Sequence, residues 1–249
     1  MRRRWMEQRK KRFRNAGILA VALCVVIGIA SMKQDREKLS EEICETDMGA
    51  EGQGREELAG ESLADDADKQ CGGYCYEILS DGYTVEITAY QGSETTLFIP
   101  AYIEDKPVRV IGEQTFKDNK TAERIYLPQE VVEIGEEAFA GCEALQDIYI
   151  NENVEQIGKR AMADCPLLEE IVFPEALSTI ESMICQGDTG LKQVTIQPAV
   201  SEIAEDAFTG CESLRLVYGE SEFARNYAQE NDFVYVDMER VREEGDLVW

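Results

Sequence analysis

Apolar positions recur along the second half of the chain at a constant interval of 23 residues. Segments 125–147, 148–170, 171–193 and 194–216 share the pattern without an insertion or deletion between them. A partial copy precedes them at 97–124 and carries an insertion at 101–107. A unit this short cannot bury its apolar face alone. A sustained period in the range of about 20–29 residues is therefore typical of a solenoid whose turns stack on each other.

Aligned in this register, the repeats place similar side chains at equivalent positions, and we expect these columns to form the core. One column holds isoleucine, a second holds aromatic or gap-filling side chains, and a third holds leucine, preceded by Ala122 in the first repeat. The columns are Ile111, Ile134, Ile157, Ile180 and Ile203; Phe116, Phe139, Met162, Cys185 and Phe208; and Leu145, Leu168, Leu191 and Leu214.

A fourth column holds small polar groups or thiols at the point where each repeat turns. Its members are Asn119, Cys142, Cys165, Asp188 and Cys211. We expect these side chains to hydrogen-bond the loop backbone inside the coil, with the cysteines as buried free thiols.

Alternation of apolar and polar residues at 125–127 and 148–150 predicts one half-buried strand in each repeat, and hence a parallel sheet. Its outward positions on the expected concave face are Tyr126, Tyr149, Val172, Thr195 and Tyr218, with Arg124, Asp147, Glu170 and Gln193 beside them. Three tyrosines in one row predict a ligand-binding surface, because rigid aromatic side chains dominate binding energy. The alternative is that tyrosine merely suits an exposed strand.

Both ends of the repeat region have the pattern of caps. Segments 74–79 and 83–90 alternate around Asp81-Gly82, which predicts a β-hairpin cap over 74–95. After the last repeat, residues 217–236 contain an amphipathic helical segment and a final strand at 233–236. Residues 237–249 read as a polar tail.

The repeat pattern resembles the BspA-type leucine-rich repeat family, whose consensus runs LxxIxIPxxVxxIGxxAFxxC. The match covers about residues 96–218. It implies an α/β repeat solenoid of five leucine-rich repeats over 96–216, built from short parallel strands with turns or short helices. The family is found mostly in surface or secreted proteins that adhere to or recognise other molecules. In the fourth repeat, Glu181, Cys185 and Asp188 stand where Gly, Phe and Cys are expected, which predicts a locally distorted loop.

The N-terminal region carries an export signal. Residues 1–15 are basic and are followed by 17 uncharged residues at 16–32. At 1.5 Å per residue these span about 26 Å as a helix, long enough for a transmembrane anchor with the N-terminus in the cytoplasm. The alternative is a signal peptide, with small residues at Gly28 and Ala30 for cleavage and secretion. Either way, the repeats lie outside the cytoplasm, beyond an acidic linker at 33–73 that we expect to be disordered.

The amino-acid composition limits the kinds of catalytic and binding site that the chain can form. The chain has 50 acidic and 25 basic residues and no histidine. Imidazole-based catalysis and histidine metal sites are therefore excluded, and no phosphate-binding loop occurs. We expect neither an enzyme nor a cofactor, and the acidic surface disfavours nucleic acid as a partner. Cys71 and Cys75 flank two glycines, so a local disulfide is conceivable, with Cys44 as a substitute.

Together these features predict a membrane-anchored, extracytoplasmic binding or adhesion module. Its ligand would be an extracellular protein, peptide or polysaccharide, and the N-terminal helix would hold it to the membrane. The alternative is a structural or regulatory protein of the cell envelope that assembles with other membrane proteins.

Overall fold

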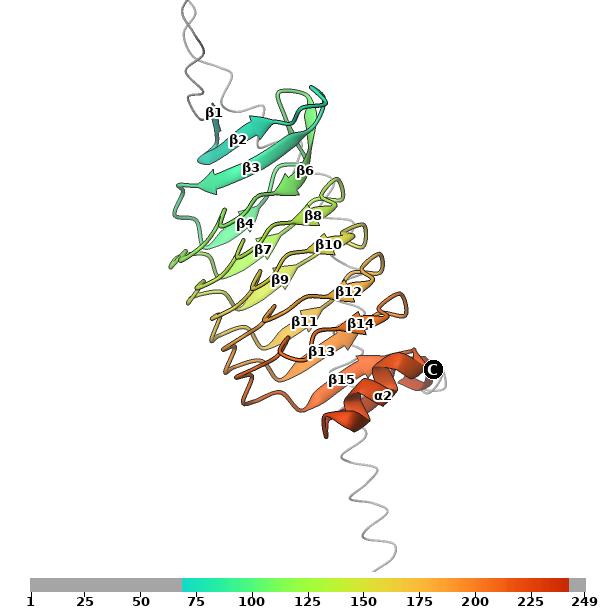
Figure 1. Cartoon of the computed structure of the whole chain (residues 1–249). Helices are drawn as coiled ribbons and strands as arrows, with labels where there is room; N and C mark the ends of the chain where they lie inside the picture. Colours follow the sequence, from blue (N-terminus) through green and yellow to red (C-terminus); the bar gives the residue numbers. More distant parts are fainter. Residues whose placement is uncertain (1–68, 242–249) are drawn as a thin grey trace, which may run out of the picture.

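The computed structural model describes residues 69–241 (Figure 1). The predicted segments at 1–15 and 16–32, the linker up to residue 68, and the end of the tail lie outside these residues. Within the described part, no helix is both long and apolar enough to cross a bilayer.

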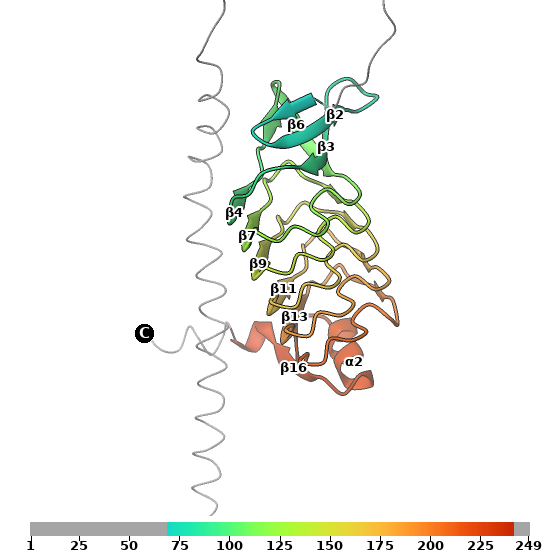
Figure 2. The same ribbon diagram turned by 90° about the vertical axis from the view of Figure 1, so that its left-hand side faces the viewer.

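The repeats form a solenoid in which each turn adds one strand to a parallel ladder, here called the first ladder. Equivalent residues of successive repeats pair in register, for example Ile125 with Ile148, so the 23-residue period becomes one turn. Figure 2 shows these strands following one another along one side of the molecule. They are β4 (Thr96–Phe98), β7 (Arg124–Tyr126), β9 (Asp147–Tyr149), β11 (Glu170–Val172), β13 (Gln193–Ile196) and β15 (Leu216–Gly219).

A second parallel ladder runs along the solenoid, where the sequence predicted only one strand per repeat. Its strands are mostly two residues long and leave no detectable alternation. Gly135 and Gly158 follow two of them, and a Cβ there would lie 2.6 Å and 2.5 Å from the backbone nitrogens of Glu113 and Glu136 in the preceding turn. Glycine thus permits the close approach of the turns. The strands are β6 (Lys106–Ile111), β8 (Glu133–Ile134), β10 (Gln156–Ile157), β12 (Thr179–Ile180) and β14 (Glu202–Ile203).

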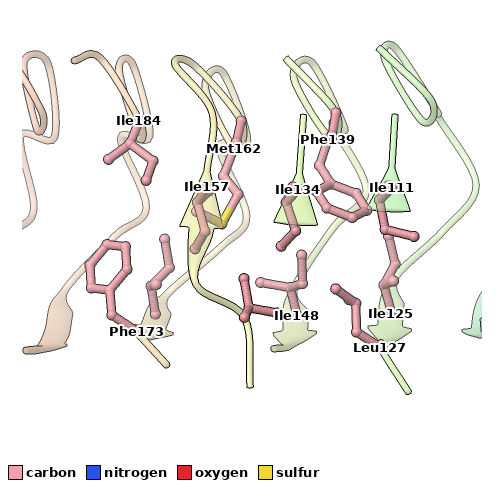
Figure 3. Close-up of a cluster of buried hydrophobic side chains, with 14 of the residues drawn as sticks. Ile111, Ile125, Leu127, Ile134, Phe139, Ile148, Ile157, Met162, Phe173 and Ile184 are labelled. Atoms are coloured by element: carbon pink, nitrogen blue, oxygen red, sulfur yellow. The ribbon is translucent and has the colours of Figure 1, made fainter. Parts of the chain in front are cut away.

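The core lies between the two ladders and consists of the predicted columns (Figure 3). The isoleucine column is buried from Ile111 to Ile180, and Ile203 is partly buried at its end. In the aromatic column, the rings of Phe116 and Phe139 stack with centroids 5.2 Å apart. The column prediction is confirmed, because repetition at one period places each apolar side chain against its own equivalent.

The thiol column also forms the predicted bonds. The Sγ of Cys142 donates to the carbonyl of Phe116 at 3.2 Å, and the Sγ of Cys165 donates to that of Phe139 at 3.3 Å. Cys211 makes the equivalent bond to the carbonyl of Cys185 at 3.0 Å.

Asp188 occupies the same column as a fully buried acid. Its Oδ1 accepts a hydrogen bond from the backbone nitrogen of Cys165 at 2.7 Å, while its Oδ2 has no hydrogen-bond partner. Burial, and then the negative charge of Asp164, raise the pKa of Asp188 to about 8. The group is therefore largely neutral at pH 7.

Both ladders are interrupted where the third repeat meets the fourth, whereas the departures from the consensus at Glu181, Cys185 and Asp188 predicted a distorted loop. The first ladder divides into a β4-β7-β9 sheet and a β11-β13-β15-β16 sheet, and the second divides between β10 and β12. The turn side remains continuous here, because the backbone nitrogen of Met162 donates to the carbonyl of Ile184 at 3.0 Å.

The N-terminal cap contains the predicted hairpin, β2 (Tyr74–Ile78) and β3 (Val85–Tyr90). The ring of Tyr90 packs against that of Phe116 with centroids 5.4 Å apart and an interplanar angle of 37°, so the cap extends the internal aromatic column. Two further elements were not predicted: β1 (Lys69–Cys71), which lies within the expected linker, and β5 (Tyr102–Ile103), which pairs with β6 inside the insertion.

The local disulfide between Cys71 and Cys75 is not present. Cys71 pairs with Tyr74 and Cys75 pairs with Gln70 across the β1–β2 hairpin. Neighbouring positions of a strand point to opposite faces, so this register directs the two sulfur atoms apart.

The C-terminal end adds a sixth turn where five repeats were expected. Strand β15 keeps the register of the first ladder, and the chain then departs from the period to form α2 (Glu222–Glu230) and the parallel strand β16 (Val234–Asp237). The helix buries Ala224 and Ala228, in agreement with the predicted apolar face. In the preceding repeats the connections are turns rather than the short helices that the fold class allowed.

Candidate binding surface

The outward side of the first ladder is here called the strand face. It carries all the residues that the sequence singled out, because alternation buries the middle residue of a three-residue strand such as β7 and turns the first and third residues away from the core. Arg124 and Asp147 are exposed, and Tyr126, Tyr149, Val172 and Thr195 are half-buried. Glu170 and Gln193, at the start of their strands, are also half-buried.

Three aromatic rings stack in a row on the N-terminal half of the strand face, and we call them the aromatic ladder. Phe98 lies on Tyr126 with ring centroids 4.7 Å apart and an interplanar angle of 10°. Tyr126 lies on Tyr149 at 4.4 Å and 3°. In-register pairing of β4, β7 and β9 places the three side chains side by side.

Phe98 was not among the predicted site residues. The partial repeat at 97–124 contained the signal, because Phe98 follows Leu97 as Tyr126 follows Ile125. The insertion after it obscured this equivalence, and the observed pairing of Phe98 with Tyr126 restores it.

Parallel stacking determines which atoms face outward. Each inner face of the ladder is covered by the neighbouring ring, so the outer surface consists mainly of ring edges and the tyrosine hydroxyls. Burial, followed by the nearby Asp147 carboxylate, raises the pKa of Tyr149 to about 12. Tyr149 therefore remains protonated at physiological pH.

Carboxylates flank the aromatic ladder. Asp147 starts the strand that carries Tyr149, and Glu170 occupies the equivalent position on the next turn. Partial burial, together with the negative charge of Asp147, raises the pKa of Glu170, although a hydrogen bond from Gln193 opposes the shift. In the described part of the chain, neither carboxylate forms an ion pair, since Arg124 approaches Glu123 instead at 4.0 Å.

Tyr218 differs from the other two tyrosines of the predicted row. It is only 4% exposed, it lies outside the main core cluster, and it has β13 on one side and β16 on the other. It therefore adds little contact area for a ligand. The usable aromatic surface lies at the opposite end of the row, on Phe98, Tyr126 and Tyr149.

Within residues 69–241, no group of three or more cysteine, aspartate or glutamate side chains is placed to hold a metal ion. The solenoid of stacked strands and the repeated isoleucine, aromatic and thiol columns define a leucine-rich-repeat protein.

Residues 95–227 match the family model described as "BspA type Leucine rich repeat region", in six copies. The match covers more than half of the chain, so this chain belongs to the BspA-type leucine-rich repeat family. The six copies agree with the six strands from β4 to β15 in the first ladder.

Among solved structures, the chain is similar to a T. pallidum leucine-rich repeat protein. The sequence identity is 26% and the TM-score is 0.59, over 69% of this chain and 82% of that one. This similarity supports the fold.

Two further structures show weaker similarity. One is a leucine-rich repeat protein from Bacteroides capillosus, with 28% identity and a TM-score of 0.46 over 61% of this chain and 98% of that one. The other is a leucine rich cell surface protein from Faecalibacterium prausnitzii, with 22% identity and a TM-score of 0.44 over 62% of this chain and 55% of that one. No curated protein matches the chain.

Proposed function

We propose that this protein is a binding module displayed outside the cytoplasm, and that its strand face contacts the ligand. The aromatic ladder carries this proposal. Three large rings are aligned in register on an outward surface that the core does not require. Aromatic side chains of this kind supply contact area at a low cost in conformational entropy, which is why they dominate binding energy at interfaces.

Display outside the cytoplasm is supported by the N-terminal sequence. The uncharged segment 16–32 follows eight basic residues, an arrangement that orients an anchor with its N-terminus in the cytoplasm. Cleavage within this segment would release the same module in secreted form. In either case, the acidic linker would separate the solenoid from the export signal.

The proposal is tested by probing a glycan-and-protein array with the full-length chain, kept in detergent if residues 16–32 require it. We expect one or more ligands whose binding weakens in a Tyr126→Ala/Tyr149→Ala double variant. Loss of two anchoring rings should lower affinity by about tenfold or more.

Tyr83→Ala is the matched control, because Tyr83 is 77% exposed and belongs to the N-terminal cap. Its binding should equal that of the wild type. Equal affinity of the double variant and the wild type would rule out the strand face as the ligand site. Capture of membrane subunits by cross-linking would favour the alternative role in envelope assembly.

A further inference from the structure

The strand face is a narrow strip. Its six strands, about 4.8 Å apart, span roughly 24 Å from the first to the last. Each strand holds three or four residues at about 3.3 Å per residue, so the strip is only about 10–13 Å wide. The area of this strip is well below the roughly 800 Å² that each partner buries in a standard protein interface. A single extended polypeptide has the matching width, and seven or eight of its residues would run the length of the strip.

The orientation of the aromatic rings disfavours a sugar as the ligand. Sugars stack their apolar C–H groups on the open face of an aromatic ring, where the negative charge of the quadrupole lies. In the aromatic ladder, the facing surfaces of Phe98, Tyr126 and Tyr149 are occupied by one another. Both faces of Tyr126 and one face each of Phe98 and Tyr149 are covered in this way. The ring edges and hydroxyls suit the side chains and amide groups of a polypeptide.

The charge beside the aromatic ladder identifies the kind of polypeptide. Asp147 and Glu170 occupy equivalent positions on the two turns that meet at the interruption of the first ladder, and the raised pKa of Glu170 reflects both its burial and the negative charge of Asp147. Within their own sheets Asp147 pairs in register with Arg124 and Glu170 with Gln193, so the two like charges face each other across the interruption. Neither carboxylate is neutralised by an ion pair within residues 69–241. A cation from a ligand would remove this repulsion and form charge-assisted hydrogen bonds.

We infer that the strand face binds an extended segment of a partner protein that contains lysine or arginine. The segment crosses the strands, with its cationic side chain at Asp147 and Glu170 and an apolar side chain against the edges of Tyr126 and Tyr149. This inference rests on the proposed function, and it names the class of partner for the same surface.

The test uses the immobilised full-length chain and a display library of random 12-residue peptides. We expect selection on the wild type to enrich lysine and arginine together with apolar residues. The Asp147→Asn/Glu170→Gln double variant keeps the shape of both side chains and removes their charge. Affinity of the selected peptides for this variant should fall at least about tenfold, and the loss should shrink as the salt concentration rises, since added salt screens the attraction.

The control variant is Glu133→Gln/Glu202→Gln, which removes two exposed carboxylates from the second ladder. It has the same net charge as the test variant, so unchanged binding would show that the position of the charge matters. Circular dichroism of all variants would identify any loss of folding, and Glu170→Gln alone then serves as the milder substitution.

The outcomes separate the inference from the proposed function. Peptides whose binding needs Tyr126 and Tyr149 but not Asp147 and Glu170 would overturn the cationic partner and leave the binding surface intact. Binding of glycans but of no peptide, if it requires the same tyrosines, would also overturn the cationic partner and leave the binding surface intact. Peptide binding that is insensitive to both pairs of substitutions, or no selected peptide and no array ligand, would overturn both.

Discussion

The two halves of the strand face share one backbone register but carry different side chains. In the N-terminal half, β4, β7 and β9 present Phe98, Tyr126 and Tyr149 as a stack of rings. In the C-terminal half, β11 and β13 present Val172 and Thr195, and the tyrosine of β15 is buried. The hydrogen-bonded ladder is interrupted where the two halves meet.

This difference separates residues that build the solenoid from residues free to serve another purpose. Inward positions are alike in both halves, because each side chain must fill the space beside its equivalent in the next turn. Outward positions lack this constraint and differ between the halves. A row of stacked rings at outward positions therefore favours a functional interpretation, and it lies on the β4-β7-β9 sheet.

The largest effect is expected from truncating the aromatic column. Phe139 is fully buried and stacks with Phe116, whereas Phe208 near the C-terminal end is only partly buried. We expect Phe139→Ala to lower the free energy of unfolding by about 3–5 kcal/mol. Phe208→Ala should cost clearly less, as measured by urea denaturation. Equal losses would show that the two halves are packed equally well.

A smaller effect of opposite sign is expected at Asp188, in the C-terminal half. Asp188→Asn keeps the acceptor for the backbone nitrogen of Cys165 and removes a buried acid, so it should stabilise the fold by on the order of 2 kcal/mol at pH 7. Cys165→Ser, in the same column, provides a comparison without an acid. If Asp188→Asn proves less stable than the wild type, the claim that the buried acid destabilises the fold is wrong.

The same residue predicts a pH dependence. The pKa of Asp188 is about 8 in the folded state, against an ordinary value of 3.8. Between these values the folded protein holds a proton that the unfolded chain releases. The contribution of Asp188 to the free energy of unfolding therefore falls as pH rises from about 4 to 8. Urea titrations across this range should show a steeper decline for the wild type than for Asp188→Asn.

A further stability effect is expected where a glycine lies close to the backbone of the preceding turn. A Cβ at Gly158 would meet backbone of the preceding turn at 2.5 Å, so Gly158→Ala should cost about 1–3 kcal/mol. Ala204 occupies the same repeat position in the C-terminal half and already carries a Cβ. Ala204→Gly should change stability by no more than about 1 kcal/mol. A neutral Gly158→Ala, measured by thermal unfolding, would show that both halves tolerate the Cβ.

The sequence anticipated the core and the caps but only part of the candidate surface. Columns such as Ile134, Ile157 and Ile180 could be predicted because each turn buries an equivalent side chain, and the same residue type therefore recurs at a constant interval. The second ladder was missed, since two-residue strands such as β8 and β10 leave no alternation. Phe98 was missed because an insertion separates it from the regular repeats.

By itself, the sequence determined the solenoid, its 23-residue turn and which side chains face inward, because these follow from a local pattern that each turn repeats. Tertiary structure alone decided that Tyr218 is buried, that three rings stack face to face, and that Asp188 lies where an acid is neutral. Those properties depend on neighbours that the period does not encode, such as strand β16 beside Tyr218. Periodicity specifies a direction for each side chain, and only contacts between distant segments specify its surroundings.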